Sequence, residues 1–100
     1  MKDRISAEEG VRGAVDGAVR ALALKLKELG INRIRIEDIP DIGSYQIVEP
    51  ESPSGEVEKM IRALFSLIDE GYKVDESESD EGIITKYAVE GVEIIEFTPY

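Results

Sequence analysis

Residues 83–97 read Ile-Ile-Thr-Lys-Tyr-Ala-Val-Glu-Gly-Val-Glu-Ile-Ile-Glu-Phe, and this stretch decides the fold. β-Branched and aromatic residues on both sides of a two-residue Glu90-Gly91 connection are typical of a β-hairpin. A connection of this length sets the register of the two strands. The expected cross-strand pairs are Val89 with Val92, Tyr87 with Ile94 and Thr85 with Glu96.

Both faces of this hairpin carry apolar side chains, because side chains alternate between the faces of a strand. Ile84, Ile95 and Phe97 lie on the face opposite Thr85 and Tyr87. If helices cover only one face, these three residues remain uncovered and mark an association surface. The alternatives are a strand that is buried on both faces, or a bulge that changes the register.

Upstream of the hairpin, two helical patterns alternate with strand patterns. Residues 6–29 predict a long helix that starts with a Ser6–Glu9 capping box and ends at Gly30. Its apolar residues recur at helical spacing and predict a buried face, made of Val11, Val15, Ala18, Leu22, Leu26 and Leu29. A second helix is expected over 54–70, closed by Gly71. Strands are expected over 31–37 and 72–76.

These elements predict an α+β domain in the order α-β-(β)-α-β-β-β. Two helices would pack on one face of a mainly antiparallel sheet, forming a two-layer sandwich. The chain of 100 residues is long enough for one such domain, residues 1–100. We expect an irregular connection over 38–55, which is rich in turn residues, with 45–48 as a candidate short strand.

Small residues on the first helix form a second candidate association surface. Gly13, Gly17 and Ala21 fall on one flank of the helix at a spacing that lets another backbone approach closely. Each helical glycine costs about 0.8–1 kcal/mol relative to alanine, so the pattern needs a reason. One interpretation is a seam between two copies of the chain. A second is a close crossing by the second helix of the same chain, and a third is that the helix begins only near Gly13.

The charge is divided unequally along the sequence. Residues 1–36 hold eight Lys/Arg and five Asp/Glu, whereas residues 37–100 hold four and seventeen, and the total is −10. A basic patch for nucleic acid is one hypothesis, but the overall charge opposes it. An intrahelical ladder of Arg12, Asp16 and Arg20 is the plainer interpretation. The candidate basic patch consists of Arg12, Arg20, Lys27, Arg33 and Arg35.

Residues 75–81 hold five acids in seven positions and predict an exposed hairpin loop. The loop is a candidate docking site for a basic protein. It fails the EF-hand pattern, which requires glycine where Glu81 stands and glutamate where Tyr87 stands. A carboxylate enzyme that uses a divalent ion therefore remains only a third alternative. The acidic residues are Asp75, Glu76, Glu78, Asp80 and Glu81.

The sequence has no His and no Cys, which argues against zinc sites, thiolate nucleophiles and imidazole bases. We therefore expect no catalytic residues, no metal and no cofactor. The composition predicts no membrane segment, a cytoplasmic location and, from its few amides and many charged residues, a thermophile-like protein. The leading hypothesis is a non-enzymatic protein-interaction module or homodimeric subunit, whose partner is itself or a basic protein. A nucleic-acid-associated protein is the alternative.

Overall fold

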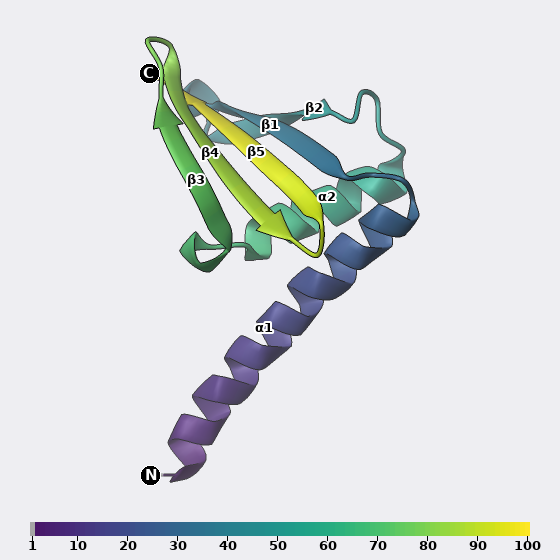
Figure 1. The fold of residues 1–100 in the computed structure, drawn as a ribbon, viewed down its shortest axis with the longest axis vertical. Helices are drawn as coiled ribbons and strands as arrows, with labels where there is room; N and C mark the ends of the chain where they lie inside the picture. The colour runs from purple at the N-terminus through teal and green to yellow at the C-terminus, as the bar shows by residue number, and fades with distance from the viewer. Residues whose placement is uncertain (1) are drawn as a thin grey trace.

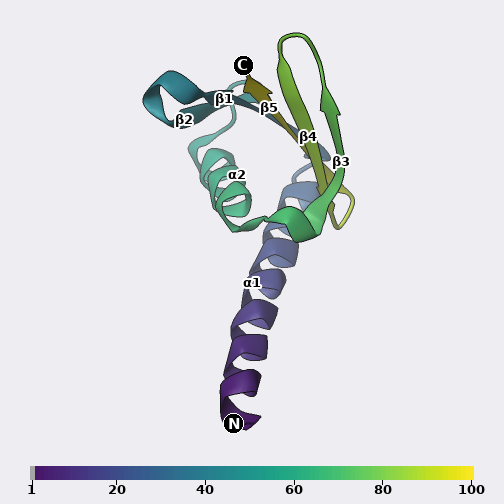
Figure 2. The ribbon, with the colours of Figure 1, turned by 90° about the vertical axis from the view of Figure 1, so that its left-hand side faces the viewer.

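A computed structural model describes residues 2–100 of the chain, with side chains from residue 12 onward. Two helices lie on one side of a five-stranded sheet, and the N-terminal half of the first helix extends well beyond the sheet (Figures 1 and 2). No helix among these residues is long and apolar enough to cross a membrane. The elements are α1 (Lys2–Glu28), β1 (Arg33–Ile39), a 3-10 turn η1 (Pro40–Ile42), β2 (Ser44–Glu49), α2 (Gly55–Leu67), a 3-10 turn η2 (Glu70–Tyr72), β3 (Lys73–Glu78), β4 (Gly82–Val89) and β5 (Val92–Pro99).

The expected α+β class and element order are confirmed. The strands lie side by side in the order β2-β1-β5-β4-β3. All neighbours are antiparallel except β1 and β5, which are parallel. The expected hairpin register is confirmed as well, since Val89 pairs with Val92 and Thr85 with Glu96. Glu90 and Gly91 both have positive φ, 50° and 80°, as a type I′ turn requires.

The end of α1 follows the expected glycine stop. Gly30 has a φ of 85°, and the Ile31 amide donates to the carbonyl of Leu26 at 3.0 Å. The Gly30 amide donates to the carbonyl of Lys27 at 2.9 Å, which completes a Schellman motif. The start differs from the prediction, because α1 begins at Lys2 and its backbone is already helical at Ser6. The side chains of the expected capping box lie outside the described part of the chain.

The buried face of α1 is rotated relative to the predicted one. Val19 and Ala23 are fully buried beside Leu26, although neither was assigned to the apolar face. Ala18 is exposed and Leu29 is 49% exposed, so both were assigned to that face wrongly. Helical spacing allows several overlapping apolar stripes here, and docking on the sheet and α2 selects one. The side chain of Val11 lies outside the described part of the chain.

Two boundaries between elements also differ from the predictions. The stretch 38–55 is less irregular than expected, because it contains the end of β1, η1 and all of β2. The second helix begins as expected at Ser54, whose hydroxyl caps the amide of Val57 at 3.3 Å. It ends at Leu67, before Gly71, which lies inside η2 and does not close the helix.

The core lies between the two helices and the inner face of the sheet. α1 contributes Val19, Ala23 and Leu26, and α2 contributes Ile61 and Leu64. The strands contribute the alternate residues that face the helices, and these are Ile34, Ile36, Val89, Val92 and Ile94. One face of the sheet is therefore covered, and the other, called the outer face below, has no helix on it (Figure 2).

Candidate functional site

Ile84, Ile95 and Phe97 lie together on the outer face, where the sequence placed them. Phe97 pairs with Ile84 across the β4–β5 ladder, and Ile95 is two residues from Phe97 on the same strand. All three side chains are partly buried by their neighbours. The central strands β4 and β5 hold them rigidly, because each strand is hydrogen-bonded on both sides. The structure does not bury this face within the chain, so the alternative of a strand buried on both faces is wrong.

A shallow hollow of about 150 Å³ lies on the outer face. The sequence did not connect β1 and β2 with this face, because the parallel pairing of β1 with β5 was not anticipated. That pairing sets Arg35 beside Ile95 and Glu37 beside Phe97. The hollow is consequently lined by apolar side chains together with the charged residues Arg35 and Glu37 of β1. Its lining is Arg35, Ile36, Glu37, Val48, Ile84, Ile95 and Phe97.

Charges of both signs lie on either side of Ile95 on the outer face, with a cation next to Ile95 and an anion beyond it on each side. Arg35 is 3.8 Å from Glu49 of β2 and stands beside Ile95. On the other side of Ile95, Lys86 pairs with Asp75 of β3 in the ladder. The register of the five strands places three cations and four anions on this face, namely Arg33, Arg35 and Lys86 with Glu37, Glu49, Asp75 and Glu93. Its net charge of −1 contrasts with −10 for the whole chain.

The small residues of α1 face solvent. A Cβ atom added at Gly13 or Gly17 would meet nothing within 4 Å, and Ala21 is exposed. Gly17 and the buried Val19 are two residues apart and hence about 200° apart around the helix, so the flank points away from the core. The interpretation that the second helix of the same chain crosses closely at these glycines is wrong.

The five residues of the candidate basic patch do not form one surface. Arg33 and Arg35 lie on β1, on the outer face, whereas Arg12, Arg20 and Lys27 lie on α1. The Lys27 ammonium lies against the β4–β5 turn, 2.8 Å from where a Cβ of Gly91 would be. The expected ladder through Asp16 is also wrong. Asp16 accepts a hydrogen bond from the Tyr72 hydroxyl instead, and Arg20 is 3.8 Å from Glu90.

Arg12 and Arg20 line an open depression of about 570 Å³ between α1 and η2. Three carboxylates share its walls, those of Asp16, Asp69 and Glu70. A phosphate that approached either arginine would therefore also face acids, which opposes binding of a nucleic acid backbone. The hydrogen bond to Asp16 raises the pKa of Tyr72, so this hydroxyl stays protonated and holds η2 against the helix.

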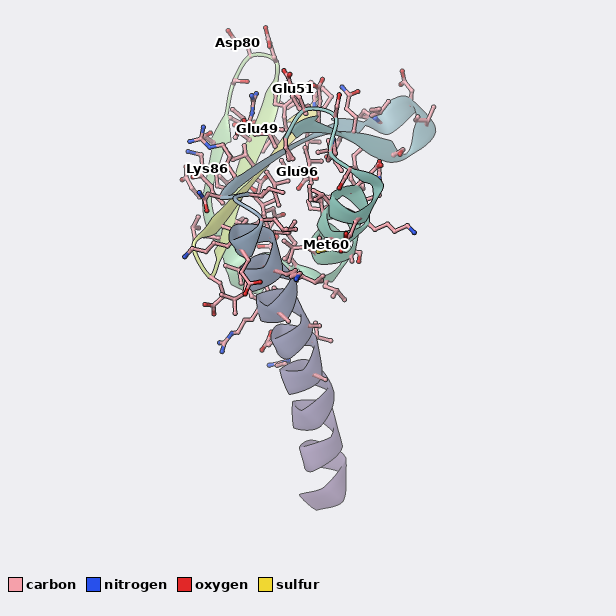
Figure 3. All side chains as sticks on the ribbon, turned by 90° about the vertical axis from the view of Figure 1, so that its right-hand side faces the viewer. Glu49, Glu51, Met60, Asp80, Lys86 and Glu96 are labelled. Carbon is pink, nitrogen blue, oxygen red and sulfur yellow. The ribbon has the colours of Figure 1, made fainter. Side chains whose placement is uncertain are left out.

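Within the acidic stretch, Asp75 and Glu76 fall in the strand expected over 72–76, whereas Glu78 was assigned wrongly to the hairpin loop. Asp75, Glu76 and Glu78 belong to β3, and only residues 79–81 connect it to β4. Asp80 lies at the tip of this hairpin (Figure 3). The acids are exposed and partly engaged within the chain: Glu76 lies 3.4 Å from Lys73, and Glu78 accepts a hydrogen bond from the Tyr100 hydroxyl at 2.6 Å. Among the described residues, no group of three or more metal-ligating side chains comes together.

One polar cluster was missed by the sequence reasoning. Glu96 and Asp38 lie on the inner face of the sheet, where the Thr98 hydroxyl donates to Asp38 at 2.8 Å and the Tyr87 hydroxyl to Glu96 at 3.4 Å. Burial, followed by a hydrogen bond and repulsion from Asp38, raises the pKa of Glu96 to about 7. Glu96 lies between the sheet and α2 (Figure 3). The alternation of side chains along β5 placed Glu96 on the inner face, but nothing in the sequence linked it to β1.

Comparisons with known proteins add no further constraint to this geometry. No protein-family model, no curated protein and no solved structure matches the chain.

Proposed function

We propose that this chain is a non-enzymatic protein-interaction module that binds its partner through the outer face of the sheet. The observation that carries the proposal is the hollow at Ile95, which combines the apolar side chains of Ile84, Ile95 and Phe97 with charges of both signs on β1, Arg35 and Glu37. Apolar centres with polar rims are typical of protein interfaces. A soluble domain would otherwise gain by placing polar residues at Ile84, Ile95 and Phe97.

The chemistry of the described side chains supports a binding role over catalysis. Among the residues whose side chains are described, Glu96 is the carboxyl group with a strongly raised pKa, and its partners Asp38 and Tyr87 lie within the fold. The depression beside α1 mixes Arg12 and Arg20 with three acids. A tyrosine hydroxyl donates to a carboxylate at each site, Tyr72 to Asp16 and Tyr87 to Glu96, and these hydrogen bonds connect elements of the fold.

The test compares the wild-type chain with Ile95→Lys, which places a charge at the centre of the outer face. Both proteins would be tagged, returned to cells of the source organism and recovered with their bound proteins, and circular dichroism would verify that each is folded. We expect the wild type to retain a partner, either a further copy or another protein, that Ile95→Lys loses. Lys59→Glu on the exposed side of α2 is the control and should retain the partner. Identical sets of bound proteins for the wild type and Ile95→Lys would contradict the proposal.

A further inference from the structure

We infer that the occupant of the outer face is a second copy of this chain, packed face to face with its strands antiparallel to those of the first. This inference rests on the proposed function and adds the identity of the partner and the register of the contact. The argument uses the charge of the face, the order of its residues and its area.

The charge of the outer face favours a second copy over a basic partner. Two molecules of charge −10 repel each other, and the repulsion is smallest where their surfaces are closest to neutral. The outer face has a net charge of −1, so most of the negative charge lies on other surfaces of the molecule. A basic protein would find stronger attraction at the acidic residues of β3 and its hairpin, such as Glu76 and Asp80, which are exposed.

The positions of the charged residues on the outer face favour one of two possible two-fold arrangements. If the two-fold axis ran along β5, Arg35 of one copy would lie over Lys86 of the other, because these residues flank Ile95 on either side. That arrangement sets like charges against each other and is disfavoured. An axis that runs across the strands, between the level of Ile95 and the level of Phe97, avoids this clash.

The second arrangement produces complementary contacts. Arg35 then lies over Glu37 of the other copy, and Ile95 lies over Phe97, because each pair occupies adjacent levels of β1 and β5. Each contact occurs twice, as an isologous interface requires. Lys86 lies over the other copy's Ile84, where its aliphatic stem covers apolar surface and its ammonium reaches the rim. Two sheets stacked in this way would form a sandwich, with a spacing of about 10 Å between the two sheets.

The area of the face suits a weak dimer. Five strands spaced about 4.8 Å apart, with about seven residues of about 3.3 Å each, present roughly 550 Å². Specific interfaces of small proteins take about a tenth of the surface, or about 800 Å² per partner. The accessible surface of this chain is 6815 Å². The outer face, at roughly 550 Å², is somewhat smaller than a tenth of this surface and smaller than the usual area of about 800 Å² per partner. We therefore expect a dissociation constant in the micromolar range.

A charge exchange tests the contact between Arg35 and Glu37. Sedimentation and light scattering would be followed over a range of concentrations at moderate salt for the wild type, Arg35→Glu, Glu37→Arg and the double variant Arg35→Glu/Glu37→Arg. We expect each single variant to raise the dissociation constant about tenfold and the double variant to recover most of the loss, because the exchange restores opposite charges across the axis. Lys59→Glu is the control. It changes the net charge by the same amount as Arg35→Glu and should leave the dimer intact. Thermal unfolding of each variant separates lost association from lost fold.

The outcomes distinguish this inference from the proposed function. A wild-type particle that remains at 11.1 kDa at high micromolar concentration overturns the inference. If Ile95→Lys nevertheless loses a different bound protein, the proposed function stands without a second copy. A dimer that is insensitive to both single variants, or that the double variant does not recover, overturns the inferred register. A dimer lost in both single variants and regained in the double variant supports it.

Discussion

Glu96 of β5 lies diagonally across from Asp38 of the neighbouring parallel strand β1, and their carboxyl groups interact on the helix-facing side of the sheet. Two carboxylates in a partly desolvated place repel each other unless one of them holds a proton. Hydroxyl groups satisfy the remaining acceptors, since Thr98 donates to Asp38 and Tyr87 to Glu96. Burial and the neighbouring Asp38 together raise the pKa of Glu96.

We expect Glu96 to make the fold less stable as the pH rises. Its pKa is raised from 4.5 to about 7 in the folded chain, so the folded state binds the proton more tightly than the unfolded state does. The stabilising effect of protonation is complete below about pH 4.5 and is lost as the pH rises through about 7. With solvent screening taken into account, the free energy of unfolding should fall by about 1–2 kcal/mol over this window.

Urea denaturation at about pH 5 and about pH 8.5 measures this effect against Glu96→Gln. The amide cannot ionise, so the variant should show a smaller pH dependence than the wild type. Glu51→Gln, at an exposed position near the end of β2, is the control and should keep the dependence of the wild type. Equal pH dependence in Glu96→Gln and the wild type would show that this carboxyl group does not govern the effect.

Gly82 at the start of β4 should not tolerate a side chain. A Cβ atom there would lie 2.8 Å from the Cα of Pro99 and closer still to the carbonyl oxygen of Thr98, both of which are backbone atoms. We expect Gly82→Ala to lower the free energy of unfolding by about 1–3 kcal/mol, because the β4–β5 ladder must open to admit the methyl group. Gly55→Ala, where nothing lies within 4 Å, is the matched control and should not lower it. Equal stability of the two variants would contradict the predicted overlap.

Substitution of Gly17 by alanine should instead raise the stability of the fold. Its Cβ position is open and its backbone is helical, so Gly17→Ala should raise the free energy of unfolding by about 0.5–1 kcal/mol through helix propensity. Denaturation curves measured at low concentration would show this. Gly17→Leu adds a separate test, because it should leave the monomer folded but abolish any association that uses this flank of α1. A loss of stability in Gly17→Ala would mean that the glycine has a packing role within the chain.

Tyr72 should contribute more to stability than Tyr100, although both hydroxyls donate to carboxylates. Tyr72 is partly buried and joins η2 to Asp16 of α1, fifty-six residues away in the sequence. Tyr100 is 72% exposed at the chain terminus, where it reaches Glu78. We expect Tyr72→Phe to lower the free energy of unfolding more than Tyr100→Phe does, because exposed hydrogen bonds exchange readily with water. The two variants should be compared by denaturation under the same conditions, and equal losses would contradict the prediction.

Local features of the sequence were sufficient for the order of the elements and for the C-terminal hairpin. The Glu90-Gly91 connection determines the pairing of β4 with β5, because a two-residue turn leaves one register for the strands. The alternation of side chains along β4 and β5 placed Ile84, Ile95 and Phe97 on one face of the sheet. Gly30 ended α1 where expected, since few other residues adopt the left-handed conformation that the Schellman motif needs. These outcomes depend on residues that are close together in the sequence.

The tertiary structure alone decided which distant segments meet. The parallel pairing of β1 with β5 brings Arg35 and Glu37 to the outer face and Asp38 to Glu96, across about sixty residues of sequence. The tertiary structure also decided which apolar stripe of α1 is buried. It leaves nothing within 4 Å of a Cβ atom added at Gly13 or Gly17. Periodicity permits several stripes and several strand orders of similar local energy. Only the packing of two helices on one sheet, which buries the most apolar surface at once, distinguishes among them.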